Sequence, residues 1–153
     1  MKNKQTNQHN KKLIEFLEQN SNKGQNTITI RLQKKRKGLE SFEIHPIYKN
    51  RNIVALNVEK RVMPMDTIFP IEIFNYVLQL LFIAADKTLP KENAQKHKMS
   101  ESGLESNTIE YAVAKKFYDK KDGDSAERRI SVISNVLIAS NICISKPSSL
   151  KLI

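Results

Sequence analysis

Two adjacent arginines, Arg128 and Arg129, stand at the head of a nearly uncharged, apolar segment that continues to Ile153. Most surface helices spread their charges along one face, whereas here both charges are gathered at one end. Guanidinium groups form bidentate hydrogen bonds with guanine bases and with phosphate oxygens. The pattern therefore raises the question of whether this end of the segment meets water or DNA.

A second basic cluster lies in the first half of the chain. Residues 34–38 read KKRKG, so four cations follow one another in a turn between two expected strands. Such a run is typical of a phosphate-binding patch or of a nuclear import signal. We assign these cations, the arginine pair and one lysine near the C-terminus to a DNA-binding surface. The residues expected to contact DNA are Lys34, Lys35, Arg36, Lys37, Arg128, Arg129 and Lys146.

The net charge of +10 is unevenly distributed along the chain. Residues 1–65 contain 14 Lys and Arg against 5 Asp and Glu, whereas residues 66–153 contain 12 against 11. This asymmetry favours a polyanionic partner, and double-stranded DNA is the better candidate because no amphipathic membrane anchor accompanies the charge. The alternative interpretation is a basic, poorly ordered tail that only aids solubility.

The sequence offers no constellation of catalytic or metal-binding residues. His9, His45 and His97 lie far apart, and the one cysteine, Cys143, lies in an apolar run typical of a core. No phosphate-binding glycine loop, dinucleotide-binding turn or activated nucleophile is recognisable. We therefore expect no enzyme, no cofactor and no small-molecule substrate. The polar N-terminus and the lone cysteine also favour an intracellular protein, with no membrane contact.

The N-terminal part reads as a tail followed by a small sheet. Residues 1–10 are rich in Asn, Gln and Lys, which predicts disorder. Residues 11–19 have the spacing of two helical turns. Residues 26–33, 40–48 and 52–59 alternate or concentrate apolar side chains as strands do, and together predict a small antiparallel sheet. We take residues 11–65 as one basic region and residues 66–153 as a second unit.

The second unit begins with the most hydrophobic segment of the chain, residues 71–87, after Pro70. A helix that is apolar around most of its circumference must be covered on more than one face, either by the fold or by another protein. The side chains expected to contact a larger partner protein are Phe74, Val77, Leu78 and Leu81. Residues 88–106 are polar and lack periodicity, which predicts an exposed inserted loop.

Two further helices and a hairpin complete the expected order. Residues 107–121 form a helix that begins with the capping-box spacing of Asn107 and Glu110. Asp124 or Ser125 is expected to cap the last helix. Residues 142–145 and 150–153 then read as two strands joined by a turn. Helix, turn, helix and hairpin is the order of a winged helix, so the predicted fold class is α+β with a C-terminal winged helix.

This C-terminal segment resembles the recognition helix and wing of the DP (dimerisation partner) transcription factors and their heterodimer partners. The matching residues are Arg128, Arg129, Asn135, Val136, Leu137, Ala139, Asn141 and Ile142. The resemblance covers about residues 107–153 and implies that the arginines reach base edges in the major groove. Where the family has a Tyr-Asp pair, this chain has Ser131-Val132. The difference favours generic DNA contact over sequence-specific reading.

The chain also looks like the small DNA-binding subunits that accompany multi-subunit DNA N6-adenine methyltransferases of some unicellular eukaryotes. It lacks that enzyme class's Asn/Asp-Pro-Pro-aromatic motif, so the resemblance implies a non-catalytic accessory subunit in the nucleus. Two other functions stay open. The chain is either a DP-like transcription regulator that binds DNA as a heterodimer, or a structural adaptor that has lost DNA binding.

Overall fold

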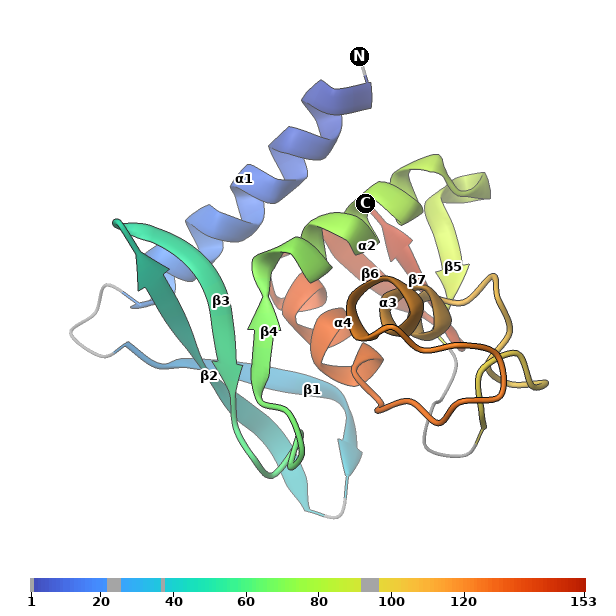
Figure 1. Cartoon of the computed structure of the whole chain (residues 1–153). Helices are drawn as coiled ribbons and strands as arrows, with labels where there is room; N and C mark the ends of the chain where they lie inside the picture. The colour runs from blue at the N-terminus through green and yellow to red at the C-terminus, as the bar shows by residue number, and fades with distance from the viewer. Residues whose placement is uncertain (1, 22–25, 37, 92–96) are drawn as a thin grey trace.

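The computed structural model describes residues 2–21, 26–36, 38–91 and 97–153. It is a mixed α+β fold in which helices α2 and α4 lie between two antiparallel sheets (Figure 1). The larger sheet has the strand order β1-β2-β3-β4, and the smaller has the order β5-β7-β6. The α+β class and the small antiparallel sheet in the N-terminal part are therefore confirmed.

The four-stranded sheet is built from two hairpins and a short edge strand. Its strands are β1 (Ile28–Arg36), β2 (Leu39–Lys49), β3 (Asn52–Val58) and β4 (Ile68–Pro70). Ile28, Ile30 and Leu32 are buried on one face of β1, as their alternation with polar residues predicts. Asn50 and Arg51, between β2 and β3, both have positive φ, which matches the twist of a two-residue hairpin turn. The three expected strands are present, and β4 was not expected.

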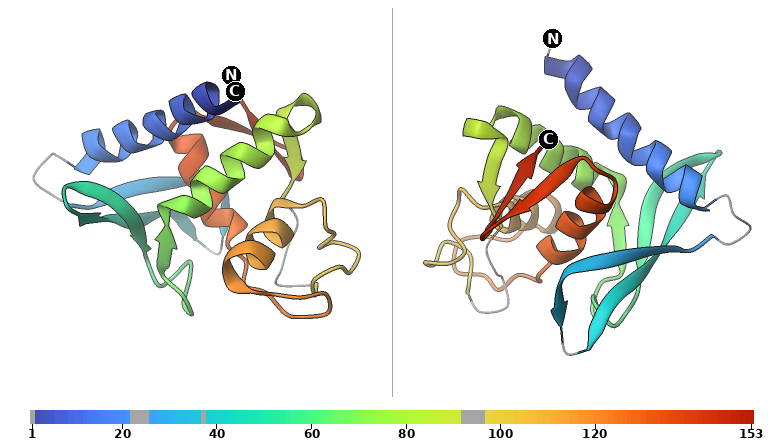
Figure 2. Two further views of the ribbon diagram at one scale, coloured as in Figure 1. Left: turned by 45° about the horizontal axis from the view of Figure 1, so that its top comes forward. Right: turned by 180° about the vertical axis from the view of Figure 1, so that it is seen from behind.

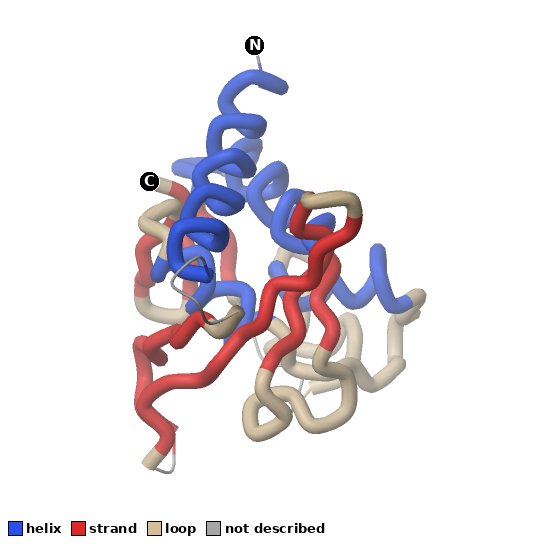
Figure 3. Tube along the Cα trace, turned by 90° about the vertical axis from the view of Figure 1, so that its left-hand side faces the viewer, coloured by secondary structure: helices blue, strands red, loops and turns tan. Residues whose placement is uncertain are grey.

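Helix α1 (Lys2–Ser21) extends through the residues that we expected to form a disordered tail. Leu13 and Leu17 are fully buried and fasten its C-terminal half, which packs against α2. Its N-terminal turns extend past the strands of the larger sheet (Figure 3). The expectation of disorder weighed composition alone, whereas the anchored half of the helix supplies a nucleus from which further turns propagate.

The second half of the chain contains three helices and the smaller sheet. Its elements are α2 (Ile71–Ile83), η1 (Ala85–Lys87), β5 (Thr88–Pro90), α3 (Ile109–Tyr118), α4 (Ile130–Ala139), β6 (Cys143–Lys146) and β7 (Ser149–Leu152). The expected hairpin is present as β6 and β7. The expected loop at 88–106 is partly wrong, because β5 pairs with β7 and because Met99 and Leu104 are buried. Those two side chains pack with Tyr111 and Ala114 in a small second core.

The main hydrophobic core is continuous through both halves of the chain. It joins Leu13 of α1 and Ile30 of β1 to α2 and α4. The four side chains of α2 that we expected to contact a partner are all fully buried in this core. They are Phe74, Val77, Leu78 and Leu81. They are therefore unavailable to a partner protein, because α1, α3 and strands of both sheets already pack against the helix that carries them.

Candidate nucleic-acid interface

Helix α4 begins at Ile130, five residues after the latest cap expected from the sequence. The carboxylate of Glu110, on α3, accepts hydrogen bonds from the backbone N–H of Arg129 at 2.8 Å and of Ile130 at 3.1 Å. Glu110 therefore caps α4 from another helix, and the expected capping box with Asn107 does not form. Thr108 caps α3 instead, because its Oγ1 accepts a hydrogen bond from the N–H of Tyr111.

Burial of Glu110 raises the pKa of its carboxyl to about 7. Its side chain is only 1% exposed, and desolvation outweighs the opposing effects of its two backbone hydrogen bonds and of the nearby arginines. The positive end of the α4 dipole is thus already occupied by a group of this chain. An external anion has no access to those two N–H groups.

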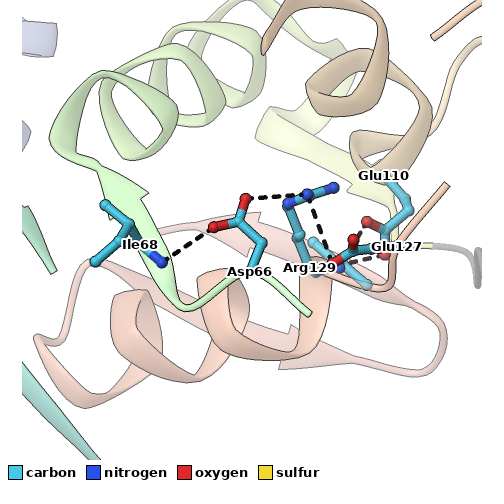
Figure 4. A network of polar contacts seen from close by, with 6 residues as sticks. Asp66, Ile68, Glu110, Glu127 and Arg129 are labelled. Atoms are coloured by element: carbon cyan, nitrogen blue, oxygen red, sulfur yellow. Dashed lines mark hydrogen bonds and ion pairs between the residues drawn. The ribbon is translucent and has the colours of Figure 1, made fainter. Parts of the chain in front are cut away.

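Arg129 points into the protein and not towards solvent (Figure 4). Its guanidinium contacts Asp66 at 3.4 Å and Glu127 at 3.7 Å, and its Cζ lies 3.3 Å from the centroid of the Tyr118 ring. The side chain is 5% exposed. Arg129 therefore joins the β3–β4 loop to α3 and to the start of α4. The structure therefore places Arg129 inside the protein, with one guanidinium nitrogen near two carboxylates and one face on the Tyr118 ring, and not at the surface where a DNA contact was expected.

Arg128 lies on the other side of the same backbone turn and lines an open groove of about 490 Å³. The groove lies between β1, the start of α4 and the β6–β7 hairpin, which are seen from behind in Figure 2 (right). Four cations line it: Lys34 from β1, Lys91 after β5, Arg128, and Lys146 from β6. Among the described residues that line the groove, none carries a carboxylate.

Lys91 is held in the groove wall by backbone and side-chain hydrogen bonds. Its N–H donates to the Ser148 carbonyl at 3.0 Å, its own carbonyl accepts from the N–H of Glu110 at 3.4 Å, and its Nζ contacts Ser145 Oγ at 3.0 Å. Burial, and secondly the charge of Arg128, lower the pKa of the Lys91 ammonium. Cations that crowd one another in this way are stabilised by an anion placed between them.

Polar but uncharged groups complete the groove wall. Ser131 and Ser134 come from α4, Ser145 and Ser148 from the hairpin, and Gln33 from β1. Hydroxyl and amide groups of this kind commonly contact phosphate and sugar oxygens in nucleic-acid complexes. The groove therefore combines positive charge with hydrogen-bonding groups, which is the composition expected of a phosphate-binding surface.

The sequence-predicted DNA contacts are thus brought together only in part. Lys34, Arg128 and Lys146 line one groove, although Lys34 and Lys146 are more than a hundred residues apart in the sequence. The structure places the backbone of Lys35 and Arg36 in β1 but does not describe their side chains, and Lys37 lies outside the described residues. Lys91 was missed, because a single lysine after Pro90 in a polar stretch carries no signal in the sequence.

The exposed side of α4 is much narrower than a recognition helix requires. Strand β1 packs against α4, and the backbone N–H of Gln33 donates to Asn135 Oδ1 at 2.9 Å. Residues 132–137 of α4 are all buried, and Ser131 and Ile138 are half-buried. The expected exposed helix face is therefore covered by the N-terminal sheet.

A second, smaller hollow of about 360 Å³ lies at the C-terminal end of α3. It is lined by Tyr111, Lys115, Lys120, Lys121 and Asp122. Tyr111 Oη donates to Asp122 Oδ1 at 2.6 Å, so an acidic side chain lies among these lysines. This surface therefore differs from the groove in having its own counter-charge, and it serves below as a control.

Comparisons with protein-family models, with curated proteins and with solved structures gave no match. The described residues contain no group of three or more His, Cys, Asp or Glu side chains arranged to hold a metal ion. In the same part of the chain, no helix has the length and apolarity needed to cross a bilayer. The candidate site therefore depends on the geometry of the basic groove itself.

Proposed function

We propose that this protein is a non-catalytic DNA-binding accessory subunit of a nuclear complex, and that it holds duplex DNA through the groove between β1, α4 and the β6–β7 hairpin. The observation that carries the proposal is the convergence of Lys34, Lys91, Arg128 and Lys146 on one groove. Neutralisation of phosphates by Lys and Arg releases counterions, which drives association with DNA. Arg128, rather than Arg129, is the arginine that takes part.

We further propose that residues 71–153 form a winged helix of the DP type. The order α2-β5-α3-α4-β6-β7, with β5 paired to the second hairpin strand, β7, supports this proposal. The resemblance of residues 128–142 to that family supports it as well. In this chain the wing contributes Lys146 to the groove, while Val132, which replaces an Asp of the family, is buried in the core.

An accessory role fits the absence of catalytic motifs from the sequence and the concentration of positive charge in residues 1–65. A DNA N6-adenine methyltransferase complex is the proposed assembly, on the resemblance to its small subunits. In such a complex another subunit would carry the cofactor and the chemistry. This chain would add phosphate contacts that lengthen the residence time of the enzyme on DNA.

One specific observation favours a second candidate, the structural adaptor. Arg129 and Asn135, two side chains of the types that most often read bases, are both engaged within the chain. If the groove binds no DNA, these contacts define a stable scaffold with a basic surface for an acidic protein. The DP-like regulator, which reads a defined site, is less compatible with the covered α4.

The proposal is tested by removing three charges from the groove and, in a control variant of equal net charge, three charges from another surface. The groove variant carries Lys34→Gln, Arg128→Gln and Lys146→Gln. The control variant carries Lys115→Gln, Lys120→Gln and Lys121→Gln. It loses three charges from the hollow beside α3 and therefore has the same net charge as the groove variant. Glutamine keeps part of the aliphatic stem, so packing is largely retained.

Binding to a duplex is measured by fluorescence anisotropy between 50 and 200 mM salt. Three phosphate contacts contribute a slope of about −2.7 in log K against log salt, so the wild type should lose about 40-fold more affinity over this range than the groove variant. The control variant should behave much like the wild type. Equal losses in both variants would show that only net charge matters, and no binding by the wild type would favour the adaptor.

A further inference from the structure

We propose that the groove binds DNA through its phosphate chain alone and that α4 reads no bases, so that binding is independent of DNA sequence. This inference rests on the proposed function and specifies how the same site works. It differs from the expectation drawn from the family resemblance, in which the end of the recognition helix enters the major groove. Three features of the described residues support it.

The first feature is the coverage of α4. A helix that reads bases must present several side chains to the major groove, which is about 12 Å wide. In α4 the residues from Val132 to Leu137 are at most 6% exposed, and β1 packs against the helix. With the strand in this position, the helix and a duplex cannot approach closely enough for contact with base edges.

The second feature is the engagement of the two side chains best suited to reading bases. Asn135 accepts from the N–H of Gln33 through Oδ1 and donates from Nδ2 to the Ser131 carbonyl at 2.6 Å. The amide that would recognise adenine therefore has both its acceptor and a donor occupied. The guanidinium of Arg129, which would recognise guanine, is stacked on Tyr118 and paired with acidic side chains.

The third feature is the chemistry of the groups that remain at the surface. Three of the four groove cations are lysines, which act as compact point charges and suit phosphate oxygens without selecting among bases. The serine hydroxyls of α4 and of the hairpin lie beside them. Such groups position a protein on the backbone and carry no direct sequence information.

Footprinting of the wild-type protein on a duplex separates backbone contact from base contact. Hydroxyl radicals probe the sugar-phosphate chain, and dimethyl sulfate probes guanine N7 in the major groove. We expect protection of the backbone with unchanged methylation of N7. The groove variant described above should lose the backbone protection, whereas the α3 control variant should keep it. Protection of guanine N7 from dimethyl sulfate would overturn the inference, since it would place α4 in the major groove.

Selection from a random-sequence duplex pool supplies an independent readout. We expect no enriched motif and affinities for individual duplexes that agree within about 3-fold, whereas sequence-specific proteins prefer their sites by at least about 1,000-fold. A motif bound 10-fold or more tightly would overturn the inference while leaving DNA binding intact. Failure of the proposed function gives a different result, because then neither the backbone nor N7 is protected.

Discussion

The buried carboxyl of Glu110 allows the energetics of the start of α4 to be tested. Two effects act on its pKa in opposite directions. The two backbone hydrogen bonds from Arg129 and Ile130 favour the ionised carboxylate, and burial disfavours it. Burial wins, and it raises the pKa of Glu110 to about 7 from an ordinary value of 4.5. The balance is measurable because it determines how the stability of the fold depends on pH.

The pKa of this carboxyl is higher in the folded protein than in the unfolded chain. Between pH 4.5 and about 7 the folded protein therefore keeps the proton that the unfolded chain has released. The contribution of Glu110 to stability is therefore fully present below pH 4.5 and is lost as the pH rises through about 7. At about 1.4 kcal/mol for each pH unit, the difference between the two pKa values corresponds to about 3 kcal/mol. Glu110→Gln, which cannot ionise, should lack this component.

Urea unfolding of the wild type and of Glu110→Gln between pH 4 and 8 measures the effect. We expect the stability of the wild type relative to the variant to fall by about 3 kcal/mol from pH 4.5 to above pH 7. The comparison cancels titration of all other groups. A relative stability that rises with pH would refute the reasoning, because it would mean that the helix cap and the arginines outweigh desolvation. At pH 4.5, where the contribution of Glu110 is fully present, Glu110→Ala should cost about 1–3 kcal/mol for each of the two orphaned N–H groups.

Three further outcomes follow from the same region and from the core. Arg129→Ala should destabilise the fold by about 2–4 kcal/mol in urea unfolding, and Arg129→Lys should restore less than half of this because it loses the stacking on Tyr118. DNA should raise the depressed pKa of the Lys91 ammonium in an NMR titration, and an unchanged value would exclude Lys91 from anion contact. Burial raises the pKa of the Cys143 thiol to about 12, so a thiol reagent at pH 8 should react only on unfolding, and rapid reaction of the native protein would contradict this burial.

The parts of the fold that the sequence predicts correctly are those with strong local periodicity. Strands β1, β2 and β3 and the β6–β7 hairpin follow from alternation of apolar and polar residues and from turn residues between them. Helix α2 follows from its continuous apolar character. Strand β5 escaped prediction because it has three residues and pairs with β7, which lies about sixty residues away.

The sequence predicted the positive charge of the candidate site but not the set of residues that form it. Clustered positive charge favoured a polyanionic partner, and three of the residues predicted to contact it, Lys34, Arg128 and Lys146, line one groove. Their convergence depends on β1 packing against α4, a contact between segments about a hundred residues apart. No local pattern encodes such a contact, and the same contact helps to bury Asn135.

The two neighbouring arginines show why residue type alone did not assign the contacts. We expected both arginines in the first turn of the last helix, where both side chains would lie at the N-terminal end of that helix and contact DNA. Helix α4 begins at Ile130, where Glu110 caps it from α3, so both arginines precede the helix and Arg129 is its N-cap residue. There they diverge, so that Arg129 enters the protein and Arg128 reaches the groove. The buried carboxyl of Glu110 thus lies at the point where one arginine enters the protein and its neighbour lines the groove.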